Sequence, residues 1–218
     1  MIINLQSTLA DIVSADERHA GVLDRTGLDY CCGGRRTLGQ ATADAGLEGS
    51  TVLGALLAAT GPSPSPPEWA HLAPGDLCDH IVDSHHRFLR DQLPVLLELA
   101  IRVEWVHGER HRELAEVRSL LATVEVEVLP HLAIEESDLF PAIRSGTRVD
   151  PDVVAALEAD HDHLGDHLDQ LRSLTAGFEP PADGCASYRS LYRGLAELDH
   201  DTRLHVHKEN NVLFDQVV

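Results

Sequence analysis

Two pairs of histidine and glutamate have the spacing of metal ligands on a helix. His131 precedes Glu135 by four residues, and His205 precedes Glu209 by the same interval. Residues four apart lie on the same face of a helix, one turn from each other. Imidazole and carboxylate together suit iron, zinc, copper or manganese. Each pair therefore predicts part of a metal site, provided that it lies on an inward helix face.

Four long helices are predicted after residue 70, and each carries a histidine in its apolar stripe. Apolar residues recur there at steps of three and four, the spacing of core positions in a helix bundle. The predicted helices are 74–106, 110–144, 151–176 and 184–215. The histidines in the four stripes are His86, His131, His161 and His205. An up-down four-helix bundle would bring these side chains together around its axis.

The glutamates in these stripes need positive charge beside them, because burying an isolated ionised carboxylate costs several kcal/mol. No arginine occupies the stripes, so a metal ion would balance the charge and also use the histidines. The predicted ligands are His86, His131, Glu135, His161, His205 and Glu209. If both glutamates bridge two irons, an oxide or hydroxide bridge leaves each iron one open position for a small molecule.

Several polar residues lie near these ligands but outside the stripes. Histidines expected to be solvated or to orient ligands are His85, His163, His167 and His207. Histidines expected at the surface are His80, His107 and His111. Glu127 and Asp160 either orient ligand histidines or belong to a solvated helix face. Pro130 lies inside a predicted helix and should kink it beside His131.

Adjacent cysteines followed by two glycines, Cys31 to Gly34, predict a tight turn near the N-terminus. A reactive thiol needs positive charge nearby to lower its pKa, and Arg35 and Arg36 follow at once. The equally weighted alternative is two small buried residues in a turn. The chain's four cysteines form no zinc motif and no disulfide framework, so we expect free thiols.

A segment rich in proline and serine divides the chain. We expect an N-terminal helical domain over 1–59, a linker over 60–70 and the four-helix bundle over 71–218. Histidine usage changes across this boundary, since His19 alone precedes it and the other 13 of 14 follow it. The second domain is therefore the chemically distinct one.

Composition excludes some classes of function. A formal charge of −19 argues against a nucleic-acid-binding surface. The start of the chain does not read as a secretory signal, and its longest N-terminal apolar stretch, 52–59, is too short for a membrane span. We therefore expect a cytoplasmic protein that does not enter the membrane.

The motifs taken together resemble those of a known family, the di-iron proteins for repair of iron–sulfur clusters (RIC). The resemblance covers nearly the whole chain. It is carried by the Asp29-to-Gly34 turn, the Pro-rich linker, Asp79-His-Ile81 leading to Gln92-Leu-Pro94, His131 to Glu135 with Leu139-Phe-Pro141, His161-Asp162, and Glu209 to Phe214. His85, Pro130 and His207 depart from what we expect of the family.

The resemblance implies an all-α fold, with a short N-terminal domain and a hemerythrin-like four-helix bundle. It implies a non-haem di-iron centre on the same six residues that the stripes select. It also implies recovery of iron–sulfur proteins after nitrosative or oxidative damage, with nitric oxide reacting at the irons. Cys31 and Cys32 match the family's cysteine pair, which is thought to act in partner contact, iron transfer or electron transfer.

Several functions remain open from the sequence. The protein would donate iron to damaged clusters, or reduce nitric oxide with electrons from an unidentified donor, or do both. A dioxygen-binding or redox-sensing protein is the alternative, with His85 or His207 as a fifth histidine ligand. Storage of zinc or other ions is a third reading. The sequence identifies neither the client proteins nor whether the chain forms a homodimer.

Overall fold

The computed structural model describes residues 2–60 and 65–217. These residues form helices joined by short turns, with one isolated β-bridge between Thr8 and Thr37 and no β-strand among them. The all-α prediction is therefore confirmed. Contacts divide the chain into two compact units: unit 1 is Met1–His80 with Arg203–Val218, and unit 2 is Ile81–Thr202. Residues 61–64, in the predicted linker, lie outside the described residues.

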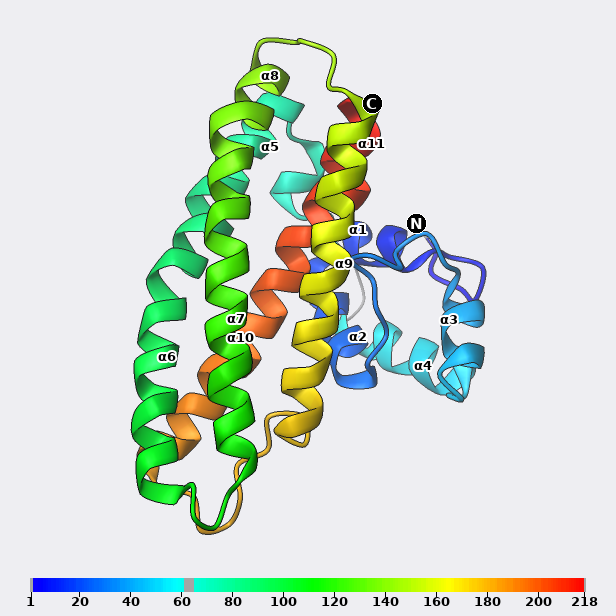
Figure 1. Ribbon diagram of the computed structural model, residues 1–218. Helices are drawn as coiled ribbons and strands as arrows, with labels where there is room; N and C mark the ends of the chain where they lie inside the picture. The colour runs from blue at the N-terminus through cyan, green and yellow to red at the C-terminus, as the bar shows by residue number, and fades with distance from the viewer. Residues whose placement is uncertain (1, 61–64, 218) are drawn as a thin grey trace. The chain divides into compact units, whose positions relative to one another are not determined.

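Unit 2 is built on the predicted long helices: α6 (Arg87–His107), α7 (Glu113–Ile134), α9 (Pro151–Leu174) and the larger part of α10 (Ala186–Lys208). Figure 1 shows α6, α7 and α9 running beside one another, with α10 behind them. Helix α6 packs on α7, and α7 packs on α9. An ion pair between Arg172 and Asp199 joins α9 to α10. Gly194 of α10 leaves room for Leu96 of α6, whose side chain a Cβ would meet.

The core of unit 2 consists of the predicted stripe positions. Buried apolar residues from the four helices include Leu89, Leu93, Val124, Val128, Leu157, Leu168, Leu191 and Leu198. Each fully buried side chain of this size contributes roughly 1.5–3 kcal/mol to folding. The same stripes therefore hold the helices together and fix the direction of the histidines that interrupt them.

Three of the helices contain a short π-helical segment, and each segment begins or ends at a predicted ligand. The segments are η3 (Val82–His86), η4 (Glu135–Leu139) and η5 (Glu209–Leu213). Segment η3 lies between α5 (Pro74–Ile81) and α6. Segment η4 lies between α7 and α8 (Phe140–Arg144), and η5 lies between α10 and α11 (Phe214–Val217). A π turn adds a residue to the helix and re-aims the side chains around it, and such turns are frequent at functional sites. Helix α7 runs through Pro130 to Ile134.

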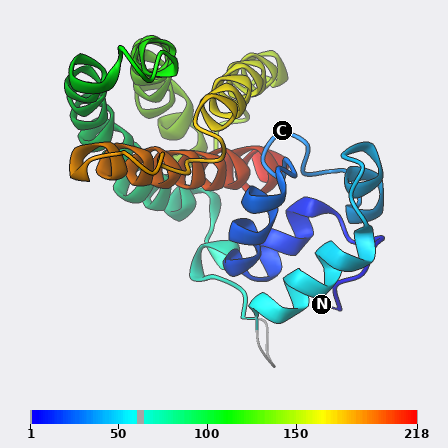
Figure 2. The same cartoon turned by 90° about the horizontal axis from the view of Figure 1, so that it is seen from below.

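Unit 1 gathers the short helices of the N-terminal region, shown from blue to cyan in Figure 2. They are α1 (Leu9–Ala15), η1 (Glu17–His19), α2 (Ala20–Thr26), α3 (Leu38–Asp44), α4 (Gly49–Ala59) and η2 (Glu68–His71). Thr37 and Gln40 form a capping box at the start of α3. Gly27 ends α2 in the left-handed conformation, with φ of 67°. The core includes Leu204 from the end of α10.

Candidate metal centre

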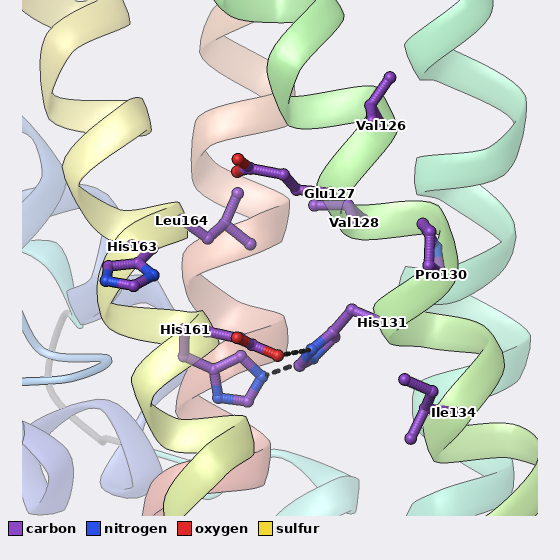
Figure 3. Close-up of a pocket in the computed structure, with 10 residues that line it drawn as sticks. Val126, Glu127, Val128, Pro130, His131, Ile134, His161, His163 and Leu164 are labelled. Carbon is purple, nitrogen blue, oxygen red and sulfur yellow. Dashed lines mark hydrogen bonds and ion pairs between the residues drawn. The ribbon is translucent and has the colours of Figure 1, made fainter.

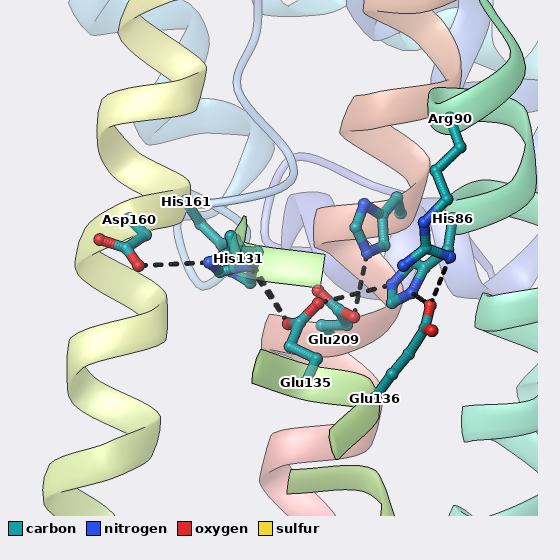
Figure 4. A network of polar contacts seen from close by, with 9 residues as sticks. His86, Arg90, His131, Glu135, Glu136, Asp160, His161 and Glu209 are labelled. Atoms are coloured by element: carbon teal, nitrogen blue, oxygen red, sulfur yellow. Dashed lines mark hydrogen bonds and ion pairs between the residues drawn. The ribbon is translucent and has the colours of Figure 1, made fainter. Parts of the chain in front are cut away.

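Four of the six predicted ligands lie together in unit 2. Nitrogen and oxygen atoms of His131, Glu135 and His161 all lie within 4.8 Å of one another. His86 Nε2 lies 3.4 Å from Glu135 Oε2. Figure 4 shows the three histidines around the Glu135 carboxylate, which come from η3, α7 and α9. The structure thus unites residues that are up to 75 positions apart in the sequence.

The Glu135 carboxylate has the surroundings of a metal ligand. Its side chain is fully buried, and neither oxygen accepts a hydrogen bond from the described residues. Imidazole nitrogens lie around it instead, with Nε2 of His131 at 3.2 Å and Nε2 of His161 at 3.9 Å from Oε1. A buried carboxylate without a donor is costly, and a cation between these atoms would remove that cost. The donor set therefore fits a metal ion.

The two histidines on α7 and α9 support the same conclusion. Nε2 of His131 and Nε2 of His161 are 3.0 Å apart, and the two rings meet edge to face with centroids 4.9 Å apart. Both nitrogens point at the space beside Glu135. Two imidazole lone pairs repel each other at this distance, whereas a shared proton or a metal ion attracts both.

Carboxylates contact the outer nitrogens of two of the predicted ligand histidines. His86 Nδ1 lies 2.7 Å from Glu136 Oε1, which also accepts a hydrogen bond of 2.7 Å from Arg90. Burial opposes ionisation of Glu136, but the hydrogen bonds from Arg90 and His86 outweigh it and hold its pKa below the usual value. His131 Nδ1 lies 3.2 Å from Asp160 Oδ2. A proton on each Nδ1 leaves the Nε2 lone pair free for a metal.

These contacts settle two of the sequence expectations and add a residue that sequence reasoning missed. Asp160 contacts His131, a predicted ligand, as one of its two readings required. Glu127 instead pairs with His167 at 2.9 Å on the exposed face. Glu136 was missed because it directly follows Glu135 and so lies outside the apolar stripe. The sequence showed only that a second acid follows the predicted ligand Glu135. It did not show that Arg90 and His86, from another helix, would contact this acid.

A pocket opens beside the two rings on α7 and α9. It has a volume of about 370 Å³, and His131 and His161 form part of its wall. Figure 3 shows the apolar side chains of Val128, Pro130 and Leu164 around it. The pocket offers a small molecule a way to approach the rings of His131 and His161.

The other two predicted ligands form a pair in unit 1. His205 Nε2 lies 3.0 Å from Glu209 Oε1, and both side chains are buried. The geometry matches that of His131 and Glu135, where the corresponding distance is 3.2 Å. His205 lies near the end of α10, a helix that begins in unit 2 and ends in unit 1.

Three histidines outside the stripes are buried. His85 contacts Asp201 through Nδ1 at 2.9 Å. His207 contacts Ser14 through Nε2 and the Tyr30 carbonyl through Nδ1. Burial chiefly lowers the pKa of His207 to about 4, so it is neutral and both its nitrogens are engaged within unit 1. The expectation that His107 is a surface residue is wrong, since it is 6% exposed.

The four cysteines are free thiols, as expected. Cys31 and Cys32 lie in the predicted turn, where the Asp29 carboxylate accepts hydrogen bonds from both backbone N–H groups at 3.0 Å and from the Cys31 thiol. A Cβ on Gly34 would lie 2.7 Å from the Tyr30 carbonyl oxygen, so this position requires glycine.

The two arginines that follow this turn pair with carboxylates. Arg35 pairs with Asp215, and Arg36 pairs with Asp44. The hydrogen bond to Cys32, burial and the charge of Asp29 raise the pKa of Cys31 well above its usual value. Cys31 is therefore a thiol at neutral pH and matches the alternative of a buried residue in a turn, whereas a pKa lowered by Arg35 and Arg36 is contradicted for it.

Comparisons with known proteins agree with the fold and the donor set. The model of the hemerythrin HHE cation binding domain matches residues 79–217, and a domain of unknown function (DUF542) matches residues 5–60. The iron-sulfur cluster repair protein YtfE of Enterobacter sp. (strain 638) is 32% identical over 213 residues, 96% of each chain. The protein of the same name from Salmonella paratyphi B is 30% identical over 211 residues, again 96% of each chain.

The bundle and the matched domain together define a hemerythrin-like cation-binding protein. More particularly, the chain belongs to the family of iron–sulfur cluster repair proteins, so the resemblance inferred from its motifs is confirmed. Within the described residues, no helix is both long and apolar enough to cross a membrane.

Proposed function

We propose that this chain is a non-haem di-iron protein that repairs iron–sulfur clusters damaged by nitrosative or oxidative stress. The observation that carries the proposal is the buried Glu135 carboxylate, which faces imidazole nitrogens and accepts no hydrogen bond from the described residues. The family membership supports iron as the metal and cluster repair as the task, because the relatives carry that name.

The proposed ligands of the two irons are His86, His131, Glu135, His161, His205 and Glu209. Contacts within unit 2 support the first four of these residues. A separate contact within unit 1 supports His205 and Glu209. The matched cation-binding domain spans both sets. Two ferrous ions would bring four positive charges to two glutamates, and a bridging oxide or hydroxide would bring the site closer to neutrality.

Bound iron would supply either metal for a damaged cluster or electrons for coupling two nitric oxide molecules. The chain's residues have defined tasks in both cases. Glu136 and Asp160 hold the rings of His86 and His131 with Nε2 directed inward. The pocket beside His131 and His161 admits a molecule of the size of nitric oxide or dioxygen.

The proposed partners are damaged iron–sulfur proteins and, for nitric oxide reduction, an electron donor that the sequence does not identify. We assign Cys31 and Cys32 to iron or thiol transfer toward the client. The raised pKa of Cys31 favours a protonated thiol that a metal or a client must deprotonate on binding. We keep the cytoplasm as the site of action expected from the sequence.

The dioxygen-binding alternative gains no support from His207. Both nitrogens of that ring contact residues of unit 1, so the ring is not available as a fifth ligand. We therefore retain cluster repair as the proposed function.

A reconstituted repair assay tests the proposal. A dehydratase with a [4Fe–4S] cluster is inactivated with nitric oxide, the nitric oxide is removed, and the iron-loaded protein is added without oxygen. We expect client activity to return and iron to move to the client. Glu135→Ala should lose most of this effect, whereas Glu127→Gln, an exposed carboxylate on the same helix, should retain it. Equal repair by Glu135→Ala and the unaltered protein would contradict the proposal.

A further inference from the structure

A second group of reactive side chains lies in unit 2, apart from the candidate metal centre. His107 ends α6, and Cys185 directly precedes α10. His107 Nε2 lies 3.2 Å from Cys185 Sγ. Helix α6 separates this pair from His86 by 21 residues, or about 30 Å along its axis. Neither residue therefore belongs to the metal site.

The imidazole of His107 is directed at the sulfur. The ring is nine-tenths buried, and its Nδ1 has no hydrogen-bond partner among the described residues. Among the described residues, Cys185 Sγ is thus the hydrogen-bond partner of the His107 ring. The Tyr188 ring packs edge to face against the His107 ring, with centroids 5.4 Å apart, and holds the imidazole in place.

Cys185 lies at a helix N-terminus and is an exposed residue. Its carbonyl accepts a hydrogen bond of 3.0 Å from the Arg189 N–H, which makes it the residue that caps the 23-residue helix α10. A helix N-terminus favours negative charge, and a neighbouring imidazole can take a thiol proton. Cys78, by contrast, is fully buried.

We infer that Cys185 is a nucleophilic thiol that His107 assists, and that it is a site of modification by peroxides and soft electrophiles. With hydrogen peroxide, the thiol proton passes to His107 Nε2 as the sulfur attacks one oxygen. The S–O bond forms, the O–O bond breaks, and the leaving hydroxide takes that proton from His107 to become water. The sulfur loses two electrons, the peroxide gains them, and Cys185 becomes a sulfenic acid.

Alkylation kinetics on the full chain test this inference. The protein is treated with iodoacetamide at pH 7 together with glutathione, and each cysteine is quantified by peptide mass spectrometry. We expect Cys185 to react at least tenfold faster than glutathione. His107→Gln should slow it about tenfold, while His167→Gln, whose ring pairs with Glu127 instead, should leave the rate unchanged.

Two outcomes would overturn the inference. One is a Cys185 rate no greater than that of glutathione, a comparison that needs no variant and so survives a misfolded His107→Gln. The other is an equal rate in His107→Gln and the unaltered protein. Peroxide treatment with dimedone present should label Cys185, and Cys185→Ser should abolish that adduct while keeping iron content and client repair. Failure here thus leaves the proposed function untouched.

Discussion

At the scale of single residues, the centre depends on how each imidazole is held. Glu136 keeps its charge because Arg90 and His86 both donate to it, and it thereby fixes which nitrogen of His86 carries the proton. His86 also stacks on Phe140, with ring centroids 5.6 Å apart. The ring is therefore restrained on its edge and on its face, and its Nε2 is left directed at Glu135.

Replacing Glu136 with glutamine should weaken metal binding while leaving the fold intact. The amide cannot hold His86 Nδ1–H as firmly as a carboxylate, and loss of such an outer contact typically reduces metal affinity about 10–100-fold. A competition titration of ferrous iron against a chelator measures this. Asp138→Asn removes an exposed charge two residues away and should change little. Equal affinities in the two variants would mean that Glu136 does not support the site.

At the scale of elements, the sequence predicted most of the fold and the residues that meet in it. The steps of three and four placed His86, His131 and His161 on inward faces, because burial enforces that period along a helix. The same reasoning could not find the π-helical segments, since one extra residue in a turn leaves the apolar pattern almost unchanged. It also missed the burial of His107 and His207, which depends on what packs against them from distant parts of the chain.

The free energy of unfolding should depend on pH through Asp16, the residue that precedes η1. Asp16 caps η1 and binds Arg18, and it also accepts the Ser65 N–H at 3.0 Å. The hydrogen bond to Arg18, working against burial, lowers the pKa of Asp16 well below its usual value. Because the folded pKa is the lower one, the stabilisation is full above the unfolded value of about 4 and is lost as the pH falls through the folded value.

Asp16→Asn should therefore destabilise the protein by about 1–3 kcal/mol at pH 7. The difference from the unaltered chain should shrink as the pH is lowered below about 4. Urea unfolding followed by circular dichroism at several pH values measures it. Asp11→Asn removes the same charge from an exposed position in the first turn of α1 and serves as the control. A constant difference across this pH range would show that the Asp16 charge is not responsible.

At the scale of the whole molecule, an acidic helical chain carries the candidate metal centre. The chain carries a formal charge of −19, and 12 of its 14 histidines lie within residues 79–217, where a cation-binding domain is matched. The N-terminal region contributes a cysteine turn held by Asp29, in which Cys31 is protonated at neutral pH. The family membership spans both regions, since the relatives match 96% of the chain.

The central claim is that the protein carries two irons on histidine and glutamate ligands. Elemental analysis of protein purified without oxygen from iron-rich medium tests it most directly, with Glu135→Ala and Glu127→Gln measured in parallel. We predict about two irons per chain with little zinc, a large loss in Glu135→Ala and no loss in Glu127→Gln. Zinc alone, no metal in fully folded protein, or unchanged iron in Glu135→Ala would contradict the account.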